Sequence, residues 1–351
     1  MPEDGESPLN APTGAEAAAT AIPVAPSLAP ALATVDAPPE YSPVDRRVIT
    51  ISGIAVLVGI GAALLAKVLT SLIGLITNIA YYGRVSTAFS APTTARLGAW
   101  SIIVPMIGAV IVGFMARYGA AAIRGHGIPE VMERVLYARS RIAPRIMFLK
   151  PLSAAFAIGT GGPFGAEGPI IATGGALGSI VGQIVRVTAD ERKTLLAAGA
   201  GGGMAATFGS PVSAVLLAVE LLLFEYRPRS VIPVALACAV ASGVRAALVG
   251  SAPVFTIPGL LQPDLTALLV YTVIGALVGL ASVYVTRFVY WIEDLYEELP
   301  VHWMWWPLIG AVFVGVIGYV EPRTLGVGYT NIDAILSGDI LGTAPLVLVV
   351  L

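Results

Sequence analysis

One carboxylate, that of Glu167, lies in a glycine-rich break between two apolar segments. The break reads G-T-G-G-P-F-G-A-E-G-P over residues 159–169. In a lipid bilayer a broken helix is tolerated only where the freed backbone faces protein or a water-filled cavity. An ionisable side chain at such depth marks a functional site by default. The pattern therefore predicts an ion or substrate pathway beside a discontinuous helix.

Two further breaks share the design of the first, in which a small or polar residue precedes a proline that starts an apolar helix. The three breaks have their prolines at Pro129, Pro169 and Pro211. Proline suits the first helical position, and a helix N-terminus offers free N–H donors and about half a positive charge. Several such ends, if they converge, bind an anion without a buried Lys or Arg, and weakly enough to release it. One break alone is equally well explained as a structural kink, whereas three favour an anion pathway.

Glu167 has two possible roles in such a pathway. When ionised, it is a tethered anion that occupies a site meant for a free anion. When protonated, it is neutral and free to swing aside, so we expect its protonation to couple to anion occupancy. The alternative is a structural carboxylate held by hydrogen bonds.

The composition predicts an all-α integral membrane protein. Hydrophobic residues make up 56% and charged residues 12% of the chain, with a mean hydropathy of +0.85. Soluble domains carry about a quarter charged residues. The net charge of -2 argues against a nucleic-acid partner. The single cysteine, Cys238, excludes a disulfide framework and a thiolate metal cluster, and we expect it to be a small buried hydrophobe.

The chain divides into an N-terminal tail and a membrane domain. Residues 1–44 are rich in Ala and Pro and lack a basic segment, which predicts a disordered tail rather than a signal peptide. The membrane domain is expected over residues 45–351. Apolar runs long enough to cross a bilayer lie at 48–82, 99–118, 231–249, 265–298 and 306–320. Shorter runs lie at 128–137, 146–158, 169–187, 191–200 and 211–224, with a glycine-rich junction at 199–203.

A basic segment and a tryptophan cluster suggest how the domain is oriented in the bilayer. By the positive-inside rule, the connection that carries the cations is expected to be cytoplasmic. Its cations are Arg139, Arg141, Arg145 and Lys150. Trp303, Trp305 and Trp306 are interpreted as an interfacial aromatic belt.

The order of segments suggests an inverted internal repeat, with residues 45–250 as the first copy and 265–351 as a partial second. A G-x-G break occurs at Gly125 and again at Gly326. Transporters often contain such repeats. The second copy of the 162–169 break would fall at about position 365. The sequence stops before that position, at Leu351, inside an apolar run. We therefore expect a C-terminally truncated sequence with an incomplete second repeat; the alternative is a short last helix tucked into the bundle.

Three motifs make the chain resemble the CLC family of chloride channels and proton-coupled chloride transporters. Residues 125–130, G-H-G-I-P-E, are similar to the family signature G-S-G-I-P-E, and residues 165–169, G-A-E-G-P, to G-[KR]-E-G-P. Residues 208–211 and Glu220 are similar to the stretch F-N-A-P…E. The third signature, G-x-F-x-P, and the late pore tyrosine of the family are absent. The resemblance begins at about Asp45 and continues to the end of the sequence.

The resemblance implies an inverted-repeat fold and transport of chloride or similar small anions, with no cofactor, metal site or catalytic residue. It implies a homodimer in the lipid bilayer of the cell membrane, with one pore per subunit and protons as possible partners. Glu167 is implied as the gating glutamate, with Glu220 as a second gating or proton residue. Backbone amides are implied to bind the anion, namely those of His126, Gly127, Ile128 and Gly168.

The chain departs from the family pattern at three positions near these motifs. His126 replaces a serine, which predicts an altered anion preference or a titrating donor; the alternative is a neutral imidazole bonded to backbone. Ala166 replaces a basic residue, so a less positive outer vestibule is expected. Leu221 replaces the internal proton-transfer glutamate, which argues against tight proton coupling unless Glu225 or His126 substitutes for it. Channel and exchanger therefore both stay open.

Two other classes of function are weighed against anion transport. An intramembrane enzyme would use Glu167 and His126, but the sequence has no H-E-x-x-H or G-x-S-x-G motif. The other class is a non-conducting membrane protein, which is the interpretation favoured if the second repeat is truncated.

Overall fold

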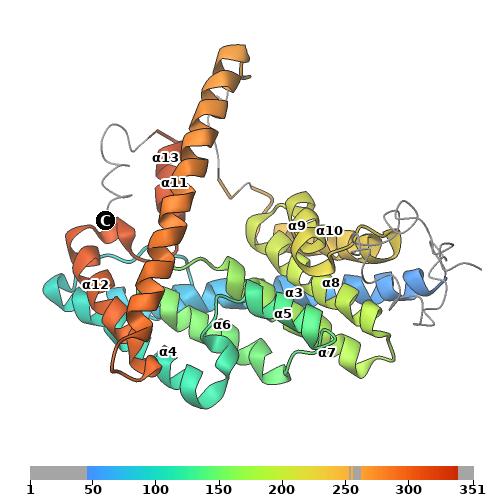
Figure 1. Cartoon of the computed structure of the whole chain (residues 1–351), viewed down its shortest axis with the longest axis horizontal. Coiled ribbons are helices and arrows are strands. Elements are labelled where there is room, and N and C mark those ends of the chain that lie inside the picture. The colour runs from blue at the N-terminus through green and yellow to red at the C-terminus, as the bar shows by residue number, and fades with distance from the viewer. Residues whose placement is uncertain (1–45, 253, 256–261, 339–351) are drawn as a thin grey trace, which may run out of the picture. The chain divides into compact units, whose positions relative to one another are not determined.

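The computed structural model describes residues 46–252, 254–255 and 262–338, and these residues contain helices and loops but no strand (Figure 1). The predicted tail at 1–44 and the C-terminal run after residue 338 lie outside this range. The α-helices are α3 (Arg46–Thr77), α4 (Ile103–Phe114), α5 (Ile128–Tyr137), α6 (Pro144–Gly159), α7 (Glu167–Ile184), α8 (Ala189–Phe208), α9 (Pro211–Ala218), α10 (Pro228–Val249), α11 (Leu265–Glu297), α12 (Trp306–Val320) and α13 (Tyr329–Leu336).

Within the described residues, five helices are long and apolar enough to cross a membrane, which confirms the predicted spans. Short π or 3-10 turns extend three of them. The candidate spans are Arg46–Tyr82, Gly98–Gly119, Pro228–Val249, Leu265–Glu297 and Trp303–Val320. Because a span needs about 20 apolar residues, the shorter helices α6 and α9 do not cross alone. The chain is a multi-pass, all-α membrane protein.

The helices form two compact units that alternate along the sequence. Among the described residues, the first unit comprises 46–69, 125–151 and 167–252, and the second comprises 70–124, 152–166, 254–255 and 262–338. Helices α3 and α6 each contribute to both units. The proposed repeat boundary near residue 250 stays a prediction.

The centre of the first unit is the packing of α7 against α8. The backbones of Gly174 and Gly199 touch: a Cβ on either residue would lie 2.2 or 2.1 Å from the carbonyl oxygen of the other. A Cβ on Gly178 would lie within 2 Å of the Leu195 carbonyl oxygen. Small residues allow this approach, which lets membrane helices pack closely.

The glycine-rich run at 199–203 is therefore not a junction, contrary to the sequence prediction. It lies in the middle of α8, which continues without interruption from Ala189 to Phe208. The glycines contact neighbours on several sides: a Cβ on Gly201 would lie 2.9 Å from the Cys238 sulfur, and one on Gly203 would lie 2.9 Å from Ile170. Packing outweighs the low helix propensity of glycine here, because a Cβ on Gly199, Gly201 or Gly203 would approach a neighbour to less than 3 Å. Cys238 is fully buried, as predicted.

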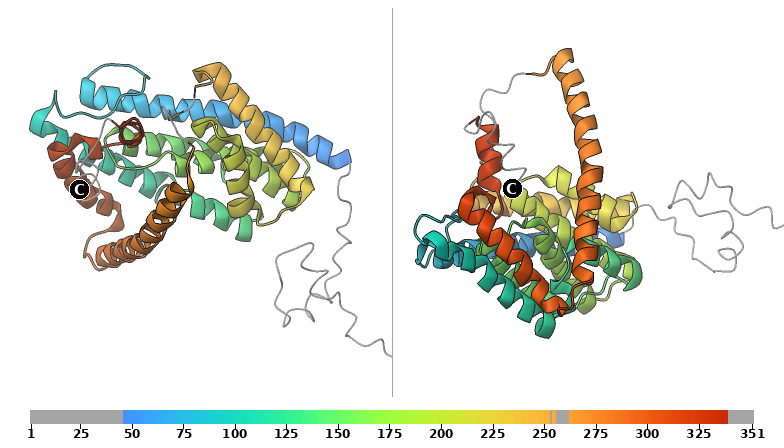
Figure 2. Two further views of the ribbon diagram at one scale, coloured as in Figure 1. Left: turned by 90° about the horizontal axis from the view of Figure 1, so that it is seen from above. Right: turned by 60° about the vertical axis from the view of Figure 1, so that its left-hand side comes forward.

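In the second unit α12 packs against the 3-10 turn and helix that form the Gly98–Gly119 span. A Cβ on Gly315 would lie 2.4 Å from the Ile102 carbonyl oxygen, so the two segments meet at backbone distance. Helix α11 differs, because none of its residues is buried. Figure 2 shows it as one long uninterrupted helix.

Candidate functional site

The first unit brings two of the three predicted helix starts together. Gly127 precedes α5 and Gly168 lies in the first turn of α7, and both are buried. A Cβ on Gly127 would lie 2.4 Å from the Gly168 carbonyl oxygen. Gly127 also has φ +113°, which L side chains rarely adopt. The two glycines thus allow two helix N-termini to meet through their backbones.

The third break has different surroundings. Gly209 ends α8 in a left-handed conformation, and Pro211 starts α9 as predicted. The nearest atoms to a Cβ on Gly209 would be those of the Arg245 guanidinium, at 3.3 Å or more. The structure therefore places the breaks at Gly127 and Gly168 in one site and the break at Gly209 beside a cation of α10.

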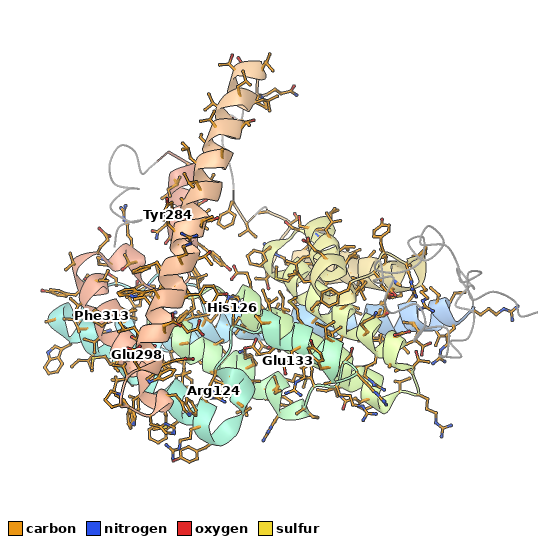
Figure 3. The ribbon with its side chains drawn as sticks, in the orientation of Figure 1. Arg124, His126, Glu133, Tyr284, Glu298 and Phe313 are labelled. Carbon is orange, nitrogen blue, oxygen red and sulfur yellow. The ribbon has the colours of Figure 1, made fainter. Side chains whose placement is uncertain are left out.

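His126 lies at the edge of this meeting point. Its backbone carbonyl points at Gly168, where a Cβ would lie about 2 Å from the oxygen, and its Nδ1 atom is 3.1 Å from the same Cβ position. The residue is exposed. Figure 3 shows His126 at the start of α5 and Glu133 further along the same helix. The imidazole thus lies beside the first turn of α7 and is accessible from outside the protein.

Glu130 closes the start of α5 with its side chain. Its Oε2 atom accepts a hydrogen bond from the Gly127 N–H at 2.6 Å, as in a capping box. A charge-assisted bond of this length is among the stronger ones. The Gly127 amide, one of the four amides expected to bind an anion, is thus occupied by an internal carboxylate.

Lys150 holds the other side of the same loop. Its Nζ atom donates to the Gly125 carbonyl at 2.5 Å, and the side chain is buried. The sequence prediction placed Lys150 in the connection before this helix, which is wrong, because the residue belongs to α6; the cytoplasmic side stays a prediction. The signal that was missed is its position, six residues inside the apolar helix and directly before Pro151. Glu130 and Lys150 thus fix the backbone on both sides of His126.

Glu167 is the first residue of α7. It is partly exposed, and its carboxylate makes no hydrogen bond or ion pair with the part of the chain that the structure describes. A negative charge at a helix N-terminus is stabilised by the helix dipole. The structural-carboxylate alternative required hydrogen-bonding partners, and these are not present among the described residues.

Glu220 and Glu225 lie near the end of the segment that follows the third break. Glu220 is exposed and lies in a π-helical turn, Val219–Leu223, that continues α9. Glu225 is held in place: it accepts from Ser230 Oγ at 2.7 Å and lies 3.4 Å from Lys193 Nζ and 3.5 Å from Arg227 Nε. These contacts hold the Glu225 side chain in place, which makes it a poor substitute for the glutamate that Leu221 replaces.

The glycines at the start of the 159–166 break are anchored within the second unit. The Tyr81 hydroxyl donates to the Thr160 carbonyl at 2.9 Å, and the Gly326 N–H donates to the Gly161 carbonyl at 3.1 Å. The second G-x-G break, predicted from the repeat, thus contacts the backbone of the 159–166 break within the second unit. No group of three or more His, Cys, Asp or Glu that would hold a metal ion occurs among the described residues.

Comparison with known proteins decides the family. The family described as "Voltage gated chloride channel" matches residues 107–351, well over half of the chain. The chain belongs to this family. The match includes both glycine sites and Glu167, and the resemblance drawn from the three motifs is confirmed.

Curated members of the voltage-gated chloride channel family are similar to this chain over part of their length. "Chloride channel protein CLC-f" of Arabidopsis thaliana is 28% identical over 262 residues, which are 70% of this chain and 32% of the relative. "H(+)/Cl(-) exchange transporter ClcA" of Vibrio campbellii is 31% identical over 234 residues, 64% of this chain and 50% of the relative. The chain thus spans half or less of the length of these curated relatives.

Solved structures of the family confirm the fold. A CLC-type fluoride/proton antiporter matches with a TM-score of 0.71 at 18% identity, covering 86% of this chain and 74% of that one. A slow cyanobacterial Cl-/H+ antiporter matches with a TM-score of 0.67 at 18% identity, covering 86% and 69%. The all-α CLC-like architecture predicted from the sequence is therefore present.

Proposed function

We propose that this protein moves chloride or a similar small anion across a membrane through a site at the Gly127–Gly168 contact. The observation that carries the proposal is the meeting of two helix N-termini at backbone distance, with Glu167 in the first turn of α7. Free N–H groups and aligned peptide dipoles favour an anion at such a place. Relatives named as channels and as proton exchangers are similar to this chain and support the same class.

Within this proposal Glu167 acts as the gate. Ionised, its carboxylate competes with the transported anion for the N-terminus of α7; protonated, it withdraws and leaves the site to the anion. Its lack of a described partner supports a side chain that moves. Glu220 is proposed as an accessory gating or proton group, since it is exposed at the π-helical turn.

The anion is proposed to bind the backbone amides of His126, Gly127, Ile128 and Gly168. The Gly127 amide already donates to Glu130, so an anion shares it with that carboxylate or displaces it. This competition weakens binding and favours release, as conduction requires. The family resemblance further supports a homodimer in the cell membrane.

The proposal is tested by anion flux in vesicles that contain the purified protein. We expect chloride efflux that increases as pH falls in the parent protein and becomes nearly independent of pH in Glu167→Gln, because the amide imitates the protonated gate. Asp264→Asn is the matched control: Asp264 is an exposed carboxylate that caps α11 and is not among the residues proposed for the site. No flux from correctly folded protein, or an unchanged pH profile in Glu167→Gln, rejects the gate.

The same vesicles separate a channel from an exchanger. A chloride gradient that drives protons uphill identifies an exchanger, and chloride flux without proton movement identifies a channel. Because Leu221 replaces an internal proton-transfer glutamate and Glu225 is held by two cations, we expect the channel outcome.

A further inference from the structure

Five arginines gather at one end of the first unit. Arg139 and Arg141 lie in the connection between α5 and α6, Arg145 lies in the first turn of α6, and Arg186 follows α7. All four are exposed. Arg192, in the first turn of α8, is buried next to them. We call these residues the arginine cluster.

Arg192 and Ser179 fix the backbone that carries this cluster. Arg192 Nε donates to the Gly182 carbonyl and Arg192 Nη1 donates to the Arg139 carbonyl, each at 3.1 Å. Ser179 Oγ donates to the Ser140 carbonyl at 2.6 Å and accepts from the Ile142 N–H at 2.9 Å. The connection is therefore held rigidly against the end of α7, and its guanidinium groups are preorganised rather than carried on a free loop.

The nearby carboxylates are used by other cations. Glu191 pairs with Arg47 at 2.6 Å, Asp190 lies 3.8 Å from Arg229, and Glu225 lies between Lys193 and Arg227. In contrast, the side chains of the four exposed arginines of the cluster form no ion pair with any described residue. The positive charge of the cluster is thus not neutralised within the described chain.

The unneutralised positive charge affects the pKa of the Arg192 guanidinium. Burial lowers this pKa, and the neighbouring charges of Arg141 and Arg139 lower it further. The guanidinium charges of Arg139, Arg141 and Arg192 repel one another, and a bound anion would relieve this repulsion. Guanidinium groups suit phosphate in particular, because their planar donors match its oxygens in pairs.

The position of the cluster indicates where the phosphate comes from. Two candidate membrane spans begin at this end of the unit, α3 at Arg46 and α10 at Pro228. Arg47 in the first turn of α3 donates to the Arg186 carbonyl at 2.7 Å, and Arg229 in the first turn of α10 contacts Asp190. Because spans begin at the interface between hydrocarbon and water, the cluster lies at the level of lipid headgroups.

We propose that the arginine cluster binds the phosphate of an anionic phospholipid of the leaflet in which it lies. The site is separate from the Gly127–Gly168 contact and does not depend on the proposed transport function. Binding neutralises the repulsion around Arg192 and stabilises the junction of α5, α6, α7 and α8.

The test measures the thermal unfolding midpoint of the full chain in phosphatidylcholine vesicles that contain increasing fractions of phosphatidylglycerol. We expect the midpoint to rise and saturate. In the double variant Arg139→Gln, Arg141→Gln the half-saturating fraction should increase about 25-fold, at about fivefold for each basic residue lost. In pure phosphatidylcholine the same variant should be at least as stable as the parent, because repulsion with Arg192 is relieved. If Arg139 and Arg141 had a purely structural role, the double variant would be less stable than the parent in pure phosphatidylcholine.

The control is the double variant Arg96→Gln, Arg117→Gln, which removes two exposed arginines of the second unit. It should keep the parent response to phosphatidylglycerol. If the Arg139 and Arg141 variant does not fold, the variant Arg145→Gln, Arg186→Gln gives the same comparison. Each of three outcomes would overturn the proposal. The unfolding midpoint of the parent could be the same with and without phosphatidylglycerol, or the two double variants could lose the response to phosphatidylglycerol equally. Inorganic phosphate could also stabilise the protein fully, with no further effect of phosphatidylglycerol.

Discussion

Gly127 and Gly168 touch through their backbones, and this contact joins the starts of α5 and α7. A Cβ on Gly127 would lie 2.4 Å from the Gly168 carbonyl oxygen, and one on Gly168 would lie about 2 Å from the His126 carbonyl oxygen. A side chain at either position would therefore clash with the backbone of the other segment and prevent the contact. It fixes the separation of the two helix ends at the proposed anion site.

Gly127→Ala should destabilise the protein and abolish anion flux. The change adds a steric clash with backbone to a φ of +113° that alanine adopts only with strain, and the two effects together should cost about 3 kcal/mol or more. Thermal unfolding and vesicle flux measure the outcome. Gly53→Ala is the control, since a Cβ there meets nothing within 4 Å in the interior of α3 and should stabilise by about 0.5–1 kcal/mol. Equal effects of the two variants would contradict the close contact.

Lys150→Met should lower stability and weaken anion binding. The methionine removes the donor to the Gly125 carbonyl, a part-buried hydrogen bond, at a cost of about 1–3 kcal/mol. Because the loop that carries His126 then loses one of its two attachments, the anion dissociation constant, measured by calorimetry, should rise. Lys67→Met is the matched control on the exposed face of α3 and should leave the constant unchanged. A loss of stability with unchanged anion affinity would limit Lys150 to a role in folding.

His126→Ser should change the selectivity of transport among chloride, nitrate and fluoride. A serine hydroxyl is smaller than an imidazole and offers an O–H donor in place of a bulkier ring N–H donor beside Gly168. Reversal potentials or competitive flux in vesicles report the permeability ratios. Identical ratios in both proteins would assign His126 to the alternative in which its ring only packs beside Gly168.

Gly174→Ala should be strongly destabilising and its neighbour Gly175→Ala should not. A Cβ on Gly174 would lie 2.2 Å from the Gly199 carbonyl oxygen, whereas the nearest atoms to a Cβ on Gly175 are side-chain carbons at 3.7 Å. Forcing α7 and α8 apart should cost about 1–3 kcal/mol. Gly175→Ala should be neutral or slightly stabilising because alanine favours helix. Unfolding midpoints compare the two directly, and a similar loss at both positions would refute the close packing of α7 on α8.

The Arg47–Glu191 pair should make stability depend on pH. The hydrogen bond from the Arg47 guanidinium holds the pKa of Glu191 below its ordinary value, although burial opposes this. A lowered pKa in the folded state stabilises the protein above the ordinary glutamate pKa of about 4.3, and the contribution is lost as pH falls further. The parent should therefore melt above Glu191→Gln at neutral pH, with the difference shrinking below about pH 4.

Asp190→Asn is the control for that measurement. Asp190 is exposed and lies 3.8 Å from Arg229, so its removal should change the midpoint little at any pH. A difference between parent and Glu191→Gln that stays constant from neutral to acid pH would show that the Arg47 contact does not stabilise the fold through charge.

The positions of helices and breaks were predictable because their signals are local. The predicted span at 265–298 became α11, Leu265–Glu297, and the predicted start at Pro211 became the start of α9. Apolar length, a leading proline and a φ that only glycine accepts act within one segment. Family membership was predictable for the same reason, since each signature is a short contiguous motif.

The sequence by itself thus determined a helical membrane protein, three proline-led breaks and the position of Glu167 in one of them. The tertiary structure decided that the breaks at Gly127 and Gly168 meet, whereas Gly209 lies beside Arg245. Only the tertiary structure decided that residues 199–203 are a packing surface inside α8, that Lys150 reaches back to the Gly125 carbonyl, and that the Gly127 amide is taken by Glu130. The physical reason is that glycine occurs both in loops and in tightly packed helices, and lysine both at surfaces and in buried hydrogen bonds. A local pattern specifies which conformations a residue permits, whereas its partner is set by segments that are distant in the chain and that folding brings within bonding distance.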